Sequence, residues 1–224
     1  MAEWIPEHWT FENDGVAQRF DDHVRETLPW YDLATHGVAH LSRAYLPDNG
    51  TLVDIGTSTG NIPRALADTI NARNINVLAY ESAPEMAKLY DAPGTVLTAD
   101  ATRLGDQFPR FDVATLFLVL MFIQPTRRQK FLQQLIDRCQ PGGAIIVVDK
   151  LPASDGYLGS SLHRWTMQQK RLGGISMTEI AEKELSLSGI QRPINPDGLT
   201  SVGFAPWLRV GEFAGWIYEA PVDL

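Results

Sequence analysis

The stretch Thr51-Leu52-Val53-Asp54-Ile55-Gly56-Thr57-Ser58-Thr59-Gly60 decides the fold of this chain of 224 residues. It begins with a short apolar run that ends at a glycine, which is typical of a strand buried in a parallel sheet. Ile62, Leu66 and Ile70 follow at helical spacing. The stretch therefore predicts a strand, a glycine turn and a helix, the unit from which α/β sheets are built.

The same alternation of strand and helix continues to Lys150. We expect further strands over residues 75–81, 95–97, 111–118 and 144–148. Ser82-Ala83-Pro84-Glu85 predicts a capping box at the start of one helix, and Pro125 opens another. This order predicts an α/β fold with a mostly parallel sheet and helices on both of its faces.

The sequence outside this core predicts an N-terminal helical cap, a helical insertion and a C-terminal hairpin. Residues 1–48 are expected to form an N-terminal helical cap, because Phe20, Val24 and Leu28 are spaced by four. Residues 49–224 are expected to form the main domain, with a helical insertion at about 156–189. The tail over 207–220 is rich in aromatic residues and predicts an edge hairpin that turns near Gly211.

Composition narrows the class of protein and its partners. The chain is 44% hydrophobic and 21% charged, which is ordinary for a globular protein. Its formal net charge of −8 disfavours nucleic acid and leaves a small molecule as the expected partner. The N-terminus does not resemble a signal peptide, and the longest apolar run, 113–123, is too short to span a bilayer. We therefore expect a cytoplasmic protein without a membrane partner.

The loop after the first strand indicates a ligand site at its backbone. Gly56 permits a sharp turn, and we expect Thr57, Ser58 and Gly60 to expose N–H groups near a helix N-terminus. A dinucleotide motif needs glycine where Ser58 and Asn61 stand, and no Gly-Lys-Ser/Thr sequence follows. A nucleoside without a pyrophosphate therefore fits better, although a plain strand–helix turn explains the loop equally well.

Two further acids follow strand ends on the same predicted edge of the sheet. Glu81 ends the second strand, where a carboxylate can accept both hydroxyls of a ribose. Asp100 follows the third strand, where it can accept from an adenine amino group while the Ala101 N–H donates to the ring. The alternative for Glu81 is a solvated acid at the start of a helix, and the alternative for Asp100 is an N-cap.

The pattern D-x-G-x-S-x-G at Asp54–Gly60, followed by Glu81 and Asp100, resembles class I S-adenosylmethionine-dependent methyltransferases. A closer resemblance is to the carboxy-S-adenosylmethionine synthase family of tRNA wobble-uridine modification, over about residues 20–189. The matching stretches are Phe20-Asp21-Asp22-His23-Val24, Pro29 with Tyr31, Val53-Asp54-Ile55-Gly56-Thr57-Ser58, Ser82-Ala83-Pro84-Glu85-Met86, Phe122-Ile123-Gln124-Pro125-Thr126-Arg127-Arg128-Gln129, Pro141-Gly142-Gly143-Ala144 with Lys150, and Lys170-Arg171 before Gly174.

The resemblance implies a Rossmann-like class I methyltransferase fold with a mostly parallel seven-stranded sheet, and S-adenosylmethionine as cofactor. It implies that Tyr31 lies over the cofactor, that Glu81 holds the ribose where the family uses Asp, and that Asp100 and Ala101 hold the adenine. The full set of cofactor-binding residues that we expect is Tyr31, Asp54, Gly56, Thr57, Ser58, Gly60, Glu81, Ser82, Asp100, Ala101 and Phe117. No metal site is expected, and no motif identifies a general base.

Two positions depart from the closer family. Phe117 stands where that family has Asn, and an ungapped count places Glu184 where it has an Arg that grips the extra carboxylate. Replacing Arg by Glu turns attraction for an anion into repulsion, unless Lys183, Lys170 or Arg171 supplies the charge. We therefore interpret the chain as a transferase, an S-adenosylmethionine-dependent methyltransferase of unknown acceptor. The alternative is a carboxy-S-adenosylmethionine synthase that uses prephenate. The resemblance also implies a homodimer formed through the insertion.

Overall fold

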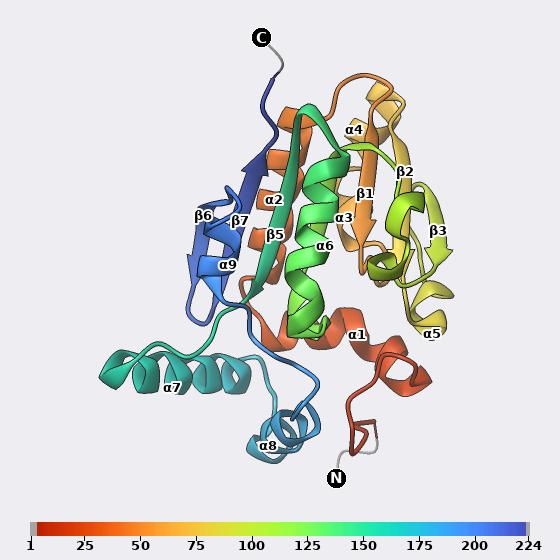
Figure 1. Cartoon of the computed structure of the whole chain (residues 1–224). Helices are drawn as coiled ribbons and strands as arrows, with labels where there is room; N and C mark the ends of the chain where they lie inside the picture. The colour runs from red at the N-terminus through yellow and green to blue at the C-terminus, as the bar shows by residue number, and fades with distance from the viewer. Residues whose placement is uncertain (1–3, 223–224) are drawn as a thin grey trace.

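The computed structural model describes residues 4–222 and contains one seven-stranded sheet in the order β3-β2-β1-β4-β5-β7-β6 (Figure 1). The strands are β1 (Thr51–Ile55), β2 (Asn76–Glu81), β3 (Thr95–Thr98), β4 (Phe111–Phe117), β5 (Cys139–Lys150), β6 (Ala205–Val210) and β7 (Phe213–Glu219). Strands β1 to β5 are parallel, and β7 runs antiparallel to both β5 and β6. The mostly parallel seven-stranded sheet expected from the sequence is confirmed.

Helices cover both faces of this sheet, as the strand–helix alternation predicts (Figure 1). They are α1 (Asp14–Thr27), α2 (Tyr31–Tyr45), α3 (Asn61–Ala65), α4 (Ala67–Arg73), α5 (Pro84–Ala87), α6 (Pro125–Arg138), α7 (Gly156–Leu172), α8 (Met177–Ser186) and α9 (Pro196–Thr200). Helix α6 packs with one buried cluster, and α2, α3 and α4 pack with the cluster on the opposite face.

The central strands are buried because both of their faces are covered. Leu116 on β4 and Ile145 on β5 have no exposed surface, and most residues of β4 and of the second half of β5 are buried. Each fully buried large apolar side chain contributes roughly 1.5–3 kcal/mol relative to its exposed state. The continuous apolar runs that predicted buried strands are explained by this two-sided packing.

The structure corrects three local predictions. The expected helix over residues 62–70 is divided at Leu66 into α3 and α4. The capping box expected at Ser82 does not form; α5 has Ala83 at its N-cap, and the Ala83 N–H donates to the Glu81 carboxylate instead. Strand β5 begins at Cys139 rather than 144, because a register shift between Phe111 and Val113 of β4 accommodates the extra residues.

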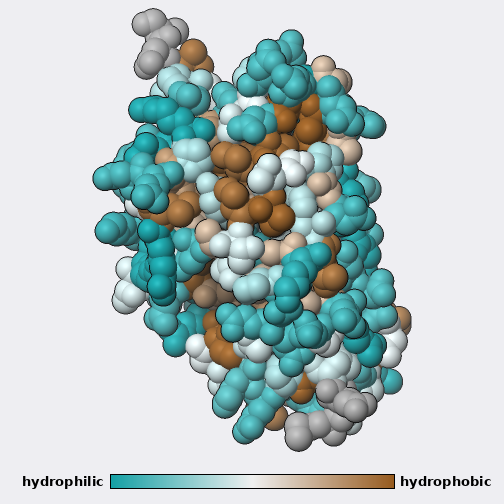
Figure 2. All heavy atoms as spheres, turned by 90° about the vertical axis from the view of Figure 1, so that its right-hand side faces the viewer, coloured by the Kyte–Doolittle hydropathy of each residue, from teal (hydrophilic) through white to brown (hydrophobic). Residues whose placement is uncertain are grey.

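The edges and ends of the sheet have different characters. The predicted hairpin is confirmed as β6–β7, with Gly211 at a φ of +55° in the turn. The opposite edge strand β3 is short, and that side of the molecule is mostly hydrophilic with apolar residues between the polar ones (Figure 2).

Helices α1, α7 and α8 lie beyond the carboxyl ends of the parallel strands (Figure 1). No helix within residues 4–222 has the length and apolar content needed to cross a membrane.

Candidate active site

A cavity lies where four parallel strands end. Its walls include Gly56 after β1, Glu81 at the end of β2, Phe117 at the end of β4 and Lys150 at the end of β5. The space measures about 1330 Å³, including the part that is open to solvent. Binding sites of α/β proteins are expected at this position, beyond the carboxyl ends of the strands.

The loop after β1 is fixed by backbone conformations that favour glycine. Gly56 has a φ of +63° and Gly60 a φ of +94°, and Ser58 between them has a φ of +55°. A Cβ atom on Gly56 would lie 2.6 Å from Val119 Cγ2, so the position has neither the conformation nor the room for a side chain. The glycines therefore shape the wall of the cavity.

The N–H groups of this loop are used differently from the sequence prediction. The Thr57 N–H donates to the Tyr80 carbonyl at 3.0 Å, and the Gly60 N–H donates to the Thr57 carbonyl at 2.9 Å. The Ser58 N–H donates to Glu81 Oε2 at 2.9 Å. The expectation that these three N–H groups are exposed to a ligand is wrong, because closing the tight turn already uses them.

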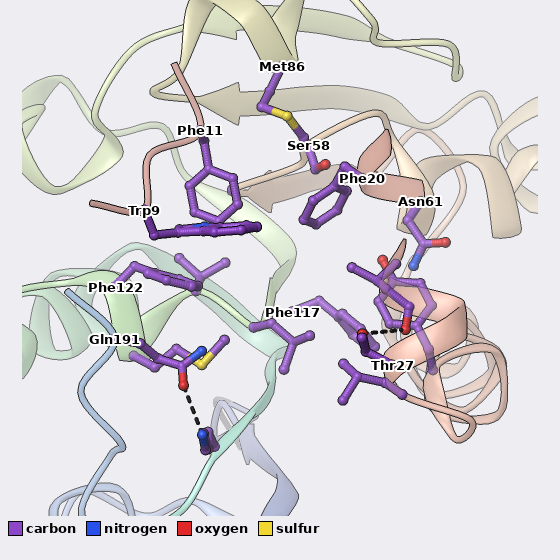
Figure 3. Close-up of a pocket in the computed structure, with 18 of the residues that line it drawn as sticks. Trp9, Phe11, Phe20, Thr27, Ser58, Asn61, Met86, Phe117, Phe122 and Gln191 are labelled. Atoms are coloured by element: carbon purple, nitrogen blue, oxygen red, sulfur yellow. Dashed lines mark hydrogen bonds between the residues drawn. The ribbon is translucent and has the colours of Figure 1, made fainter. Parts of the chain in front are cut away.

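Ser58 and Glu81 nevertheless form a polar group on the cavity wall. Ser58 Oγ is buried without a hydrogen-bond partner (Figure 3). Glu81 is 7% exposed, and its Oε1 accepts from the Ala83 N–H at 2.9 Å. Burial raises the pKa of Glu81, and the backbone hydrogen bonds partly offset that effect. The backbone N–H groups of Ser58, Ser82 and Ala83 interact with this carboxylate, whose two oxygens offer about four lone-pair sites, so the pair Ser58–Glu81 can still bind a hydroxyl group.

Asp54 ties the loop to the centre of the sheet. Its Oδ2 accepts from Thr57 Oγ1 at 2.6 Å, and its Oδ1 accepts from Thr115 Oγ1 on β4 at 2.5 Å. The carboxyl group is buried, and burial raises its pKa to about 6. Asp54 lines the cavity and also holds the cavity wall in place.

Two aromatic rings also line the cavity. Tyr31, at the start of α2, packs edge-on against Phe117 with a distance of 5.1 Å between ring centroids. Both residues line the cavity, as does Ser82. Tyr31, Ser82 and Phe117 are all in the predicted cofactor site, and the structure brings all three to the wall of one cavity.

Asp100, Ala101 and Gly60 are outside the lining of the cavity. The Asp100 carboxylate accepts from the Thr102 N–H at 3.0 Å and pairs with Arg103 at 3.0 Å. It therefore caps the short turn that follows β3, which is the alternative role considered for it. Gly60 is the N-cap of α3.

A cationic wall, which no sequence motif predicts, closes another side of the cavity. It consists of Lys150 on β5, Lys170 on α7 and Lys183 on α8, together with Glu184. Lys170 Nζ donates to Glu184 Oε1 at 2.6 Å, and this contact holds the pKa of Glu184 below its ordinary value although burial alone would raise it. Of the two outcomes left open by the sequence, repulsion of anions by Glu184 or compensation by a neighbouring cation, the structure shows compensation by Lys170.

Aromatic residues ahead of α1 complete the enclosure. Trp9 and Phe11 line the cavity together with Phe20 of α1 and with Phe122 (Figure 3). The backbone N–H of Trp9 donates to the Ser186 carbonyl at the end of α8 at 3.0 Å. Neither Trp9 nor Phe11 could be predicted from the sequence, because neither lies in a motif or at a strand end. No cluster of metal-binding side chains occurs within the described residues 4–222.

Comparison with known proteins places this geometry in a family. The family model for a methyltransferase domain matches residues 24–183. Carboxy-S-adenosyl-L-methionine synthase from Yersinia pestis (strain Pestoides F) is 25% identical over 189 residues, which cover 81% of this chain and 70% of that protein.

Solved structures support the same fold. An O-methyltransferase family protein from Burkholderia thailandensis matches with a TM-score of 0.62 at 12% identity, over 94% of this chain and 61% of that protein. Magnesium protoporphyrin IX methyltransferase from Synechocystis PCC 6803 with bound SAH matches with a TM-score of 0.57 at 15% identity, over 92% and 94% of the two chains. The chain therefore belongs to the family of methyltransferase domains, and its sheet is that of the Rossmann-like class I S-adenosylmethionine-dependent methyltransferases.

Proposed function

We propose that this enzyme transfers the methyl group of S-adenosylmethionine to a small-molecule acceptor that binds in the same cavity. The observation that carries the proposal is the polar pair on the wall, where the buried Glu81 carboxylate adjoins the unpartnered Ser58 Oγ. A nucleoside supplies hydroxyl groups that satisfy both residues, whereas the loop has no phosphate-binding sequence.

In this proposal, different residues of the cavity bind different parts of the cofactor. Glu81 accepts from the ribose hydroxyls, and Ser58 hydrogen-bonds the amino-acid end of the cofactor. Tyr31 and Phe117 pack against the apolar parts of the cofactor. The cofactor supplies an electrophilic methyl group on its sulfonium, so the protein has to position the acceptor in line with it and exclude water. Asp100 and Ala101 remain our proposed adenine contacts, although they are outside the lining described above.

Calorimetry tests this assignment directly. Titration with S-adenosylmethionine or with its demethylated product, S-adenosylhomocysteine, should show one site per chain. NAD should not bind, because the loop lacks the second and third glycines of a dinucleotide motif. Binding of NAD with an affinity equal to that of S-adenosylhomocysteine would refute the proposed cofactor site.

Synthesis of carboxy-S-adenosylmethionine is the second candidate, since the relative at 25% identity carries that name and Glu184 is neutralised by Lys170. Mass spectrometry after incubation with S-adenosylmethionine and prephenate separates the two functions. Our first proposal expects unmodified cofactor and no phenylpyruvate in that experiment.

We also propose that the protein is a cytoplasmic homodimer that pairs through α7 and α8. Six of the nine strongly exposed large apolar side chains in the described residues lie in this insertion, namely Tyr157, Leu158, Trp165, Leu172, Met177 and Leu185. Tyr157, Leu158 and Leu172 of α7 are strongly exposed, so one side of this helix can contact a partner, whereas Thr166 and Lys170 line the cavity. A second copy covers these residues in the proposed dimer.

Light scattering at micromolar concentration should give about twice the chain mass of 24.9 kDa. Trp165→Glu should give the monomer mass. Leu33→Glu is the matched control, because Leu33 is 67% exposed on α2, outside the insertion. A monomer mass for the unmodified protein would contradict the proposed dimer.

A further inference from the structure

Lys150 and Lys183 reach the cavity without a carboxylate partner. Within residues 4–222, the ion pair of the cationic wall is the one between Lys170 and Glu184, and neither Lys150 nor Lys183 forms an ion pair there. Lys150 Nζ donates to Gln191 Oε1 at 2.9 Å, and that amide oxygen is uncharged (Figure 3). When both amines are protonated, they carry positive charge that the wall does not balance.

Lys183 is surrounded by groups that do not neutralise it. Its Nζ contacts Nε2 of His23, which is buried on α1, and lies 4.6 Å from the centre of the Trp9 ring. Burial and then the charge of Lys183 lower the pKa of His23 to about 3, so the imidazole is neutral at physiological pH. Buried cations in proteins are almost always paired, which makes this arrangement suited to an anionic ligand.

Aromatic side chains line the same cavity as the two amines. Phe11 and Phe122 pack edge-on with 5.1 Å between their ring centroids, and Trp9 packs edge-on against Phe11 at 6.0 Å. The close-up shows these rings gathered on one side of the cavity, with Gln191 on the side of Phe122 (Figure 3). A ligand with an acid group at one end and an apolar body at the other satisfies both surfaces.

We propose that Lys150 and Lys183 bind the acid group of the methyl acceptor, which is a small carboxylic acid whose apolar body packs against Trp9, Phe11 and Phe122. This inference rests on the proposed methyl transfer and names the class of its acceptor. Lys170 is left to neutralise Glu184, so the two lysines without an acid partner carry out the recognition.

Binding of the acid is coupled to a proton on Lys183. Burial, followed by the charge of Lys170, lowers the pKa of Lys183 to about 7, and Lys150 acts in the same direction while Glu184 opposes it. His23 faces the amine from α1 and is neutral. Above pH 7 the amine is mostly uncharged, so an anion that binds there requires Lys183 to take up a proton. Affinity for the acid therefore falls as the pH rises from 7 to 9.

The first test compares phenylacetate with its uncharged analogue phenylacetamide. Both are titrated calorimetrically at pH 7 into the protein, with and without saturating S-adenosylhomocysteine. We expect phenylacetate to bind at least about tenfold more tightly, which corresponds to roughly one charge-assisted contact. Equal affinity for the two probes, or binding of neither, overturns the proposal. Binding of S-adenosylhomocysteine is measured separately, so a failure of the methyltransferase site is distinguished from a failure of the acid site.

Variants identify the groups that hold the acid. Lys183→Met and Lys150→Met should each weaken phenylacetate binding about tenfold and leave phenylacetamide unaffected. Lys130→Met, at an exposed position of α6, is the matched control and should change neither affinity. Lys183→Arg keeps the charge at every pH, so it should retain binding and abolish the loss of affinity between pH 7 and 9. An unchanged pH dependence in Lys183→Arg overturns the role of Lys183.

Discussion

Glu81→Gln is the substitution that most directly tests how the cofactor is held. The carboxylate accepts the Ser58 N–H at one oxygen and the Ala83 N–H at the other, both at 2.9 Å. In the proposed site, a ribose binds to the remaining acceptor sites of a group whose orientation is already fixed. Glutamine has nearly the same shape but keeps one accepting oxygen, and its amide NH₂ then faces a backbone donor.

The expected loss of affinity for S-adenosylhomocysteine follows from the loss of charge-assisted hydrogen bonds. Such bonds contribute roughly 1.5–3 kcal/mol each, and about 1.4 kcal/mol corresponds to a tenfold change in affinity. We therefore expect the Kd for S-adenosylhomocysteine to rise about 10- to 150-fold in Glu81→Gln. Isothermal titration calorimetry measures this change, and circular dichroism checks that the sheet is intact.

Asp112→Asn is the matched control for the structural part of the effect. Asp112 Oδ2 accepts the Thr51 N–H at 2.7 Å, at the end of β1 opposite to the cavity. Both substitutions replace a carboxylate that binds backbone N–H groups, but only Glu81 lines the cavity. If the affinity for S-adenosylhomocysteine falls no further in Glu81→Gln than in Asp112→Asn, Glu81 has a purely structural role and the reasoning fails.

Two further expectations concern stability. Gly56→Ala should lower the free energy of unfolding by roughly 2–3 kcal/mol in urea titrations, because it combines a φ of +63° with a Cβ position 2.6 Å from Val119. Gly105→Ala, with a φ of +52° and open space around it, should lose only the conformational part, and equal losses would contradict the crowding argument. His23→Gln should lose less stability than the unmodified protein as the pH falls from 7 to 4.5. The unfolded imidazole takes up a proton near pH 6.5 and the folded one only near pH 3, so protonation favours unfolding in that window. Parallel pH profiles of urea unfolding would show that His23 does not titrate in this way.

The sheet could be predicted from the sequence because its evidence is local. The apolar run that ends at Gly56 and the acid at Glu81 each mark the carboxyl end of one strand, and parallel strands bring those ends to the same edge. The fold and the wall around Ser58 follow from this rule. The rule does not show which backbone donors remain free, since that depends on the pairing of Ser58 with Glu81 across 23 residues of sequence.

The opposite wall could not be predicted in this way. Trp9, Lys150 and Lys183 have no shared spacing, and their proximity results from how α8 and the segment before α1 fold over the strand ends. Glu184 illustrates the difficulty. An ungapped count places a negative charge there and leaves Lys183, Lys170 and Arg171 as candidates to balance it, and the structure shows that Lys170, on a different helix, balances it at 2.6 Å. The packing of α7 against α8 therefore determines the net charge at Glu184, and a sequence motif does not show that packing.

The contact between His23 and Lys183 joins residues that are 160 positions apart in the chain. Closing so long a loop has an entropic cost that local contacts do not offset, so this wall is expected to form after the sheet during folding. The same contact can open while β1, β4 and β5 remain folded, because local opening requires less free energy than global unfolding. A ligand that bridges the two walls therefore slows amide hydrogen exchange in α1 and α8 much more than in the central strands.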